Sequence, residues 1–269
     1  MSSSGVGGDA ESYSSPASCC RLSRMHKRWP VWASEMPTHI LFDFFGTLVD
    51  YDSRRAVTEY PQTLTVLEEL GASLTGEELL TRWADSWLPF ELRSQQDHRE
   101  FSMTEVGTAF LTDVLGRMPG ADEVARLNAA YINEWNGGVY HIDGLTGWIK
   151  ELSRSYRLAI VSNTHEADLV PNHLERLGIA DLFDLVVLSV ELGWRKPHPE
   201  IYTAAMDGLR LRPEQAVFVG DTHLADFIGP QQAGITAYLI DPDRTAGIPE
   251  EHRLDSIFDL SEKLSRPAG

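Results

Sequence analysis

The sequence predicts an α/β fold in which a parallel β-sheet is interrupted, after its first strand, by an inserted all-helical domain. Short apolar runs rich in Val, Ile, Leu and Phe indicate strands buried on both faces, as in parallel sheets. The gaps between the last four runs each hold about one helix, which is the spacing of successive βαβ units. The predicted strands are Ile40–Phe44, Leu158–Val161, Leu185–Leu188, Ala216–Val219 and Ala237–Ile240.

The inserted domain is predicted from the gap between the first two strands, Val49 to Arg157, which is far longer than the other gaps. Its pattern is helical and predicts no strand. Two capping boxes, Thr75-Gly-Glu-Glu78 and Ser102-Met-Thr-Glu105, indicate helix starts. Pro61 suits the first turn of another helix.

Residues 1–36 are rich in Ser and Gly, then in Arg, and contain no apolar core segment. We therefore predict a disordered tail without the apolar segment of a secretory signal. The two cysteines, Cys19 and Cys20, are adjacent, and this usage favours a reducing, cytoplasmic setting. The predicted domains are 1–36, the tail; 37–50 with 141–269, the core; and 51–140, the helical domain.

The chain carries a net charge of −17 with a pI of about 4.8. This charge argues against binding to the nucleic-acid backbone or to anionic membrane surfaces. No run of about 18 apolar residues is present, so no membrane span is predicted. The expected partner is a small molecule, and the sequence does not indicate the oligomeric state.

Polar residues follow several predicted strands where each strand ends. Asp43 ends the apolar run Ile40–Phe42, and a carboxylate there is costly unless it serves as a ligand or nucleophile. Ser162-Asn163 and Gly220-Asp221 follow two later strands, and Lys196-Pro197 lies in a loop before a predicted helix. Because parallel α/β sheets bind ligands at the carboxyl ends of their strands, these residues are expected to converge.

This order of motifs, from about Thr38 to Ile240, resembles the haloacid dehalogenase-like (HAD) hydrolase superfamily. The resemblance implies a Rossmann-like core with a helical cap over the active site. It also implies that Asp43 is the nucleophile and that Ser162 hydrogen-bonds a phosphoryl oxygen. By the same resemblance, Lys196 neutralises the charge of the nucleophile and of the phosphoryl group. The adjoining residues predicted to bind substrate are Gly46, Thr47 and Asn163.

The resemblance further implies a magnesium site. The segment Gly220-Asp-Thr-His-Leu-Ala-Asp226 matches the superfamily's fourth motif, Gly-Asp-x-x-x-x-Asp. Asp221 and Asp226 would bind Mg²⁺ together with Asp43 and the backbone carbonyl of Phe45. Oxygen ligands, few of them from protein, are what Mg²⁺ prefers.

Phe45 departs from the superfamily's usual first motif, Asp-x-Asp-x-Thr, whose second Asp is the general acid and base. General acid and base catalysis typically raises the reaction rate by about 10²- to 10⁴-fold. The superfamily's 2-haloacid dehalogenases carry an aromatic residue here, because halide leaves without a proton. The retained Asp221 and Asp226 nevertheless favour a Mg²⁺-dependent phosphatase acting on a small phosphorylated metabolite. A 2-haloacid dehalogenase and a weakly catalytic metabolite-binding protein are the alternatives, and His165 is the first candidate for the missing proton donor.

Several nearby residues are expected to have structural or surface roles. Arg195, in the third motif, is interpreted as a solvated residue at a helix start. Trp83 and Trp87 lie one helical turn apart and are predicted to pack inside the cap. His165 and His223 lie beside the motifs without the ligand spacing of a zinc site.

Overall fold

The core is one sheet of six parallel strands in the order β5-β4-β1-β6-β7-β8, which confirms the α/β prediction. The computed structural model describes residues 37–52 and 59–265. The predicted tail and both cysteines lie outside the described residues. All five predicted strands form, with ends shifted by up to two residues. The strands are β1 (His39–Phe42), β4 (Arg157–Ser162), β5 (Phe183–Leu188), β6 (Ala216–Gly220), β7 (Thr236–Ile240) and the unpredicted β8 (Arg253–Leu254).

Strand β1 lies at the centre of the sheet, where the order of the strands reverses. Ile40 is in register with Leu158 of β4 on one side and with Val217 of β6 on the other. The chain adds β4 and β5 on one side and then crosses over to add β6, β7 and β8. A reversal of this kind opens a crevice at the carboxyl ends of the central strands, and ligands bind in it.

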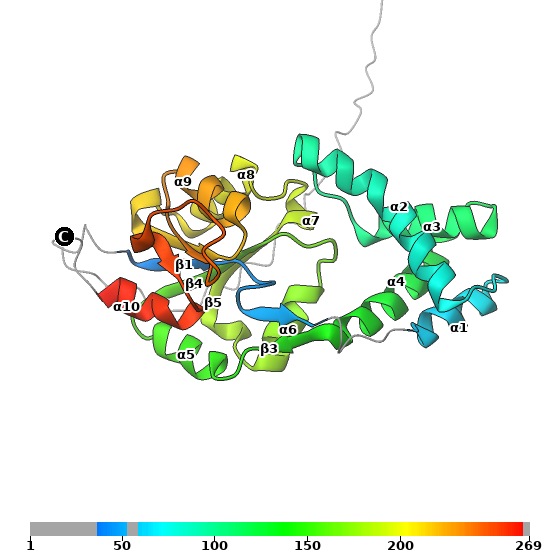
Figure 1. Ribbon diagram of the computed structural model, residues 1–269, viewed down its shortest axis with the longest axis horizontal. Coiled ribbons are helices and arrows are strands. Elements are labelled where there is room, and N and C mark those ends of the chain that lie inside the picture. The colour runs from blue at the N-terminus through cyan, green and yellow to red at the C-terminus, as the bar shows by residue number, and fades with distance from the viewer. Residues whose placement is uncertain (1–36, 53–58, 266–269) are drawn as a thin grey trace, which may run out of the picture. The chain divides into compact units, whose positions relative to one another are not determined.

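Helices cover both faces of the sheet (Figure 1). Successive residues of β1 point to opposite faces, so Ile40 and Phe42 join one apolar cluster and Leu41 joins the other. The first cluster includes side chains of α5, α6 and α10, and the second includes side chains of α8. These helices and the short ones beside them are α5 (Leu145–Leu152), α6 (Leu169–Leu177), α7 (Ser189–Leu192), α8 (Pro199–Leu209), α9 (Gly229–Gln232) and α10 (Leu260–Ser265).

The inserted cap consists of helices with an apolar core of their own. Both predicted capping boxes are present, at the starts of α2 and α3. Trp83 packs inside the cap as predicted, 4% exposed and stacked on Tyr131 with ring centroids 4.0 Å apart. Among the described residues, no helix is long and apolar enough to cross a bilayer. The cap helices are α1 (Pro61–Glu69), α2 (Gly76–Asp97), α3 (Met103–Leu115) and α4 (Ala121–Trp135).

A two-stranded antiparallel ribbon, β2 (Val49–Tyr51) with β3 (Val139–His141), brackets the cap helices. The prediction that this gap holds no strand was therefore wrong. Strands of three residues are too short for an alternating pattern to reveal them. The predicted boundaries at residues 51 and 140 fall inside this ribbon, and they stay a prediction.

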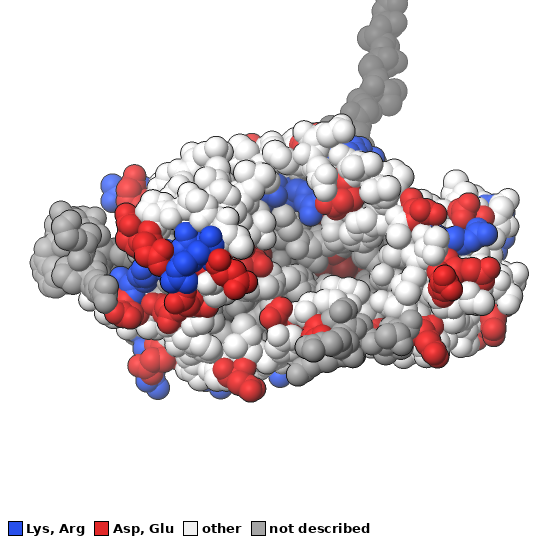
Figure 2. Space-filling view, viewed as in Figure 1, with Lys and Arg blue, Asp and Glu red and all other residues white. Residues whose placement is uncertain are grey.

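Charged side chains are distributed unevenly over the surface. On the face shown in Figure 2, acidic residues are spread widely, whereas basic residues form a few separate groups. No continuous basic surface is visible on that face. This distribution agrees with the net charge of −17.

Candidate active site

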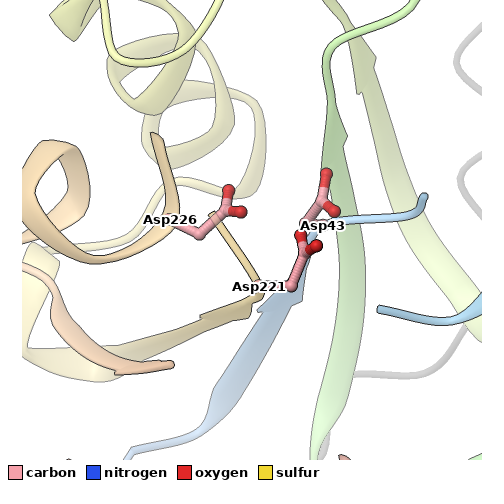
Figure 3. Close-up of side chains that lie close together, drawn as sticks. All are labelled: Asp43, Asp221 and Asp226. Carbon is pink, nitrogen blue, oxygen red and sulfur yellow. The ribbon is translucent and has the colours of Figure 1, made fainter. Parts of the chain in front are cut away.

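Three carboxylates meet at the carboxyl edge of the sheet (Figure 3). Asp43 directly follows β1, Asp221 directly follows β6, and Asp226 lies in the π-helical turn His223–Ile228. One carboxylate oxygen of each lies within 4.8 Å of the others. The structure therefore brings together the acidic residues that the sequence predicted, at the point where the strand order reverses.

Lys196 is buried between two of these carboxylates. Its Nζ donates to Asp43 Oδ1 and to Asp226 Oδ1, both at 2.7 Å, and its side chain is 2% exposed. Burial alone would lower the pKa of this ammonium, but the charges of Asp226 and Asp43 outweigh burial and raise the pKa. Lys196 is thus a fixed positive charge beside the predicted nucleophile.

The predicted nucleophile is oriented by a donor on each of its oxygens. Lys196 donates to Asp43 Oδ1, and Thr47 Oγ1 donates to Oδ2 at 3.2 Å. Gly46, with φ of +83°, turns the chain between them, and a Cβ at this position would lie 2.3 Å from Asp221 Oδ2. The structure thus places Thr47 on the nucleophile and Gly46 against Asp221. Their contact with substrate stays a prediction.

Asn163 uses both ends of its amide on the backbone of Lys196. Its Nδ2 donates to Lys196 O at 3.1 Å, and its Oδ1 accepts from Lys196 N at 2.7 Å. Ser162, the last residue of β4, is fully buried directly before it. The reciprocal pair of bonds fixes the loop that carries Lys196. The contact of Asn163 with substrate stays a prediction.

The donor set fits a divalent cation. The cluster holds three carboxylates and one ammonium, which contacts only Asp43 and Asp226, so the negative charges exceed the positive charge by two. Partial desolvation and the charge of Asp43 raise the pKa of Asp221 to about 6. Burial raises the pKa of Asp226 despite the nearby Lys196. Carboxylate oxygens in a group with excess negative charge are suitable ligands for Mg²⁺.

Phe45, whose backbone carbonyl is the fourth predicted ligand, has its ring in an aromatic cluster. Its ring centroid lies 5.0 Å from that of Phe44, 6.0 Å from that of Trp135 and 6.4 Å from that of His173. Trp135 is the last residue of α4, and Tyr51 of β2 stacks on it at 5.1 Å. The aromatic ring therefore links the turn after β1 to the junction with the cap.

A second polar cluster, which sequence reasoning missed, lies beside the site. Arg195 is not solvated as predicted: its side chain is 17% exposed and donates to Ser94 Oγ at 2.7 Å. Glu100, between α2 and α3, has a side chain only 1% exposed and accepts from Ser189 Oγ at 2.5 Å. These partners lie 101 and 89 residues apart in the chain, so no local pattern could have revealed them.

The chain is similar to several known proteins. A family model described as haloacid dehalogenase-like hydrolase matches residues 40–240. Haloacid dehalogenase-like hydrolase domain-containing protein 3 of Homo sapiens is 33% identical over 130 residues, which cover 46% of this chain and 51% of that protein. The match thus spans only about half of the human relative. A phosphoglycolate phosphatase of Nitrosococcus oceani is 27% identical over 247 residues, covering 87% of this chain and 99% of that protein.

A solved structure shares the fold over nearly its whole length. The crystal structure of a 2-haloacid dehalogenase from Pseudomonas syringae pv. Tomato superimposes with a TM-score of 0.63. The match covers 86% of this chain and 99% of that one, at 22% sequence identity. At this level of identity, the likeness establishes a common fold and leaves the reaction to be argued from the site.

Proposed function

Because the chain belongs to the haloacid dehalogenase-like hydrolase family, we propose that it is a Mg²⁺-dependent phosphatase acting on a small phosphorylated metabolite. The observation that carries this proposal is the cluster of three carboxylates, two of which are bonded to Lys196. Dehalogenation needs no metal, and without a cation these carboxylates would repel an anionic haloacid. The similarity to a phosphoglycolate phosphatase over 87% of the chain supports the same class of reaction.

The proposed reaction proceeds in two displacements at phosphorus. A carboxylate oxygen of Asp43 attacks the phosphorus atom, and the bond to the leaving oxygen breaks with its electron pair on that oxygen. The oxygen of a water molecule then bonds to phosphorus, one proton of that water passes to solvent, and the bond from phosphorus to Asp43 breaks with its electron pair on the carboxylate, which releases phosphate and restores Asp43. Lys196 and Thr47 hold the nucleophile in place throughout. Mg²⁺, held by the three carboxylates and the Phe45 carbonyl, would stabilise charge on the transferring phosphoryl group.

Phe45 is the one observation that favours the alternative, cleavage of a carbon–halogen bond. An aromatic ring occupies the place of the second Asp, so the leaving oxygen of a phosphate ester has no carboxylic acid there to protonate it. We therefore propose that the preferred substrates have leaving groups that need little protonation, such as acyl phosphates. A cytoplasmic location is also proposed, on the composition of the chain alone.

The test is hydrolysis of a panel of phosphate monoesters, acyl phosphates and 2-haloacids, with and without EDTA. We expect phosphate release that EDTA abolishes and added Mg²⁺ restores. Asp43→Asn should fold normally and lose turnover, because an amide is a poor nucleophile. The matched control is Asp243→Asn, at an exposed carboxylate in the loop after β7, which should leave the rate unchanged. Halide release undiminished by EDTA would replace the phosphatase proposal with a dehalogenase, and ligand binding without any turnover would indicate a binding protein.

A further inference from the structure

The buried carboxylate of Glu100 lies between two core loops that carry predicted catalytic residues. The first, the serine loop, is residues 162–165, and the second, the lysine loop, is residues 193–196. Resting on the proposed function, we propose that Glu100 is a positioning residue of the reaction. It is the cap side chain that holds the serine loop and the lysine loop in the arrangement that phosphoryl transfer requires.

The backbone around Glu100 is hydrogen-bonded to both loops. The cap segment between α2 and α3 forms an antiparallel bridge with the lysine loop, between Arg99 and Trp194. The same segment reaches the serine loop where α3 begins. The backbone bonds are Glu100 N to Gly193 O at 3.1 Å, Arg195 N to His98 O at 3.0 Å and Met103 N to His165 O at 2.9 Å. One short stretch of the cap therefore touches both loops at once.

The side chain of Glu100 also contacts both loops, and its contacts are charge-assisted. Oε2 accepts from Ser189 Oγ at 2.5 Å, Oε1 lies 3.1 Å from His165 Nδ1, and Arg195 Nε lies 3.9 Å from Oε2. Burial opposes ionisation of Glu100, but the hydrogen bond from His165 and the other contacts outweigh it and lower the pKa. The carboxylate is thus kept charged inside the protein by groups from both loops and from α7.

Ser189 links Glu100 to the serine loop by hydrogen bonds. A carboxylate only accepts hydrogen bonds, so the hydroxyl of Ser189 donates to Glu100 and its oxygen accepts from Thr164 N at 2.9 Å. Thr164 directly follows Asn163, whose amide clamps the backbone of Lys196. Hydrogen bonds therefore connect the cap carboxylate to Thr164 and connect Asn163 to the backbone of Lys196, and the peptide bond between Asn163 and Thr164 joins the two sets.

His165 completes the attachment of the serine loop. Its Nδ1 lies 3.0 Å from Phe101 O and 3.1 Å from Glu100 Oε1, and both of these atoms are acceptors. Nδ1 therefore carries the proton in the neutral ring. The ring also stacks on Phe101 with centroids 4.2 Å apart. The cap thus fixes both the position and the tautomer of His165.

The energetic reason for the role of Glu100 is that a buried charge tolerates few arrangements. A buried carboxylate that loses a partner is strongly destabilising, so Glu100 is stable in this place only while Ser189, His165 and Arg195 stay beside it. The same restraint holds the loops that carry Ser162 and Lys196. Because a displacement of about 1 Å in a catalytic group can reduce the rate about 10²-fold, this restraint bears directly on turnover.

The experiment compares Glu100→Ala with Glu91→Ala in the full-length protein with Mg²⁺ and p-nitrophenyl phosphate. Glu91 is the matched control because it is also a cap carboxylate beside Arg195, at 3.3 Å, but it is 28% exposed. We expect Glu100→Ala to lower kcat about 10-fold or more, with KM changed less than about twofold. Glu91→Ala should leave kcat within about twofold of wild type. Glu100→Gln, which keeps the shape and one acceptor, should recover part of the loss.

Amide hydrogen exchange supplies a readout that does not depend on turnover. Exchange at Thr164 and Arg195 should become faster in Glu100→Ala and stay at the wild-type rate in Glu91→Ala, with melting curves confirming that each variant is folded. A folded Glu100→Ala variant with wild-type kcat overturns the positioning role, even if exchange is faster. Unchanged exchange shows that Glu100 does not hold the loops. A wild-type protein inactive on every phosphate instead refutes the proposed function, whatever the exchange result.

Discussion

Alanine at Gly220, the last residue of β6, should damage the site through Asp226. A Cβ at Gly220 would lie 2.4 Å from Asp226 Cγ and 2.5 Å from its Oδ2, whereas ordinary contacts begin at 3.4 Å. Asp226 is 1% exposed and bonded to Lys196 Nζ and Thr222 N, so it has no free space to enter. A displacement of about 1 Å should lower kcat/KM about 10²-fold. The overpacking should destabilise the fold by roughly 1–3 kcal/mol.

The assay measures urea unfolding together with hydrolysis of p-nitrophenyl phosphate in the presence of Mg²⁺. Gly147→Ala in α5 is the matched control, because nothing lies within 4 Å of the Cβ that it would add. That variant should gain up to about 1 kcal/mol from helix propensity and keep wild-type activity. If Gly220→Ala keeps kcat/KM within about threefold and unfolds at the wild-type urea concentration, Asp226 does not need the space that Gly220 leaves, and the reasoning is refuted.

Three further predictions test single residues. Asn163→Leu removes both bonds to the Lys196 backbone and should lower kcat about 10-fold, whereas a rise in KM alone would make Asn163 a substrate ligand. Phe45→Asp should raise the rate on alkyl phosphates by up to about 10²-fold, and a wild-type rate independent of leaving-group pKa would contradict this. Burial and the charge of Arg157 lower the pKa of His39 to about 4. The unfolded chain therefore binds a proton that the fold excludes as pH falls below 6.5. The free energy of unfolding should therefore fall by roughly 2 kcal/mol between pH 7 and pH 5. In urea unfolding, His39→Leu should not show this part of the fall.

The sequence by itself determined the parts of the protein that depend on local chemistry. The strands follow from apolar runs buried on both faces, and the starts of α2 and α3 follow from capping boxes whose members lie three residues apart. The meeting of Asp43 with Asp221 could also be predicted, because parallel strands end at one edge of the sheet and the motifs followed those strands. Each of these inferences needed only a local period or a general rule of sheet topology.

The tertiary structure decided which residues far apart in the chain become hydrogen-bond and strand partners. The three-residue strands β2 and β3 exist only as partners of each other, across the whole cap. Asn163 is predicted to bind substrate from its place in a motif, and only the fold shows that its amide also bonds to the backbone of Lys196, 33 residues away. Arg195 looked solvated because nothing near it in sequence is its partner, and Glu100 gave no signal at all. A lone charged residue is predicted to face water, because burying an unpaired charge is costly. Only the packing of the cap against the core places beside such a residue the partner groups that make its burial stable.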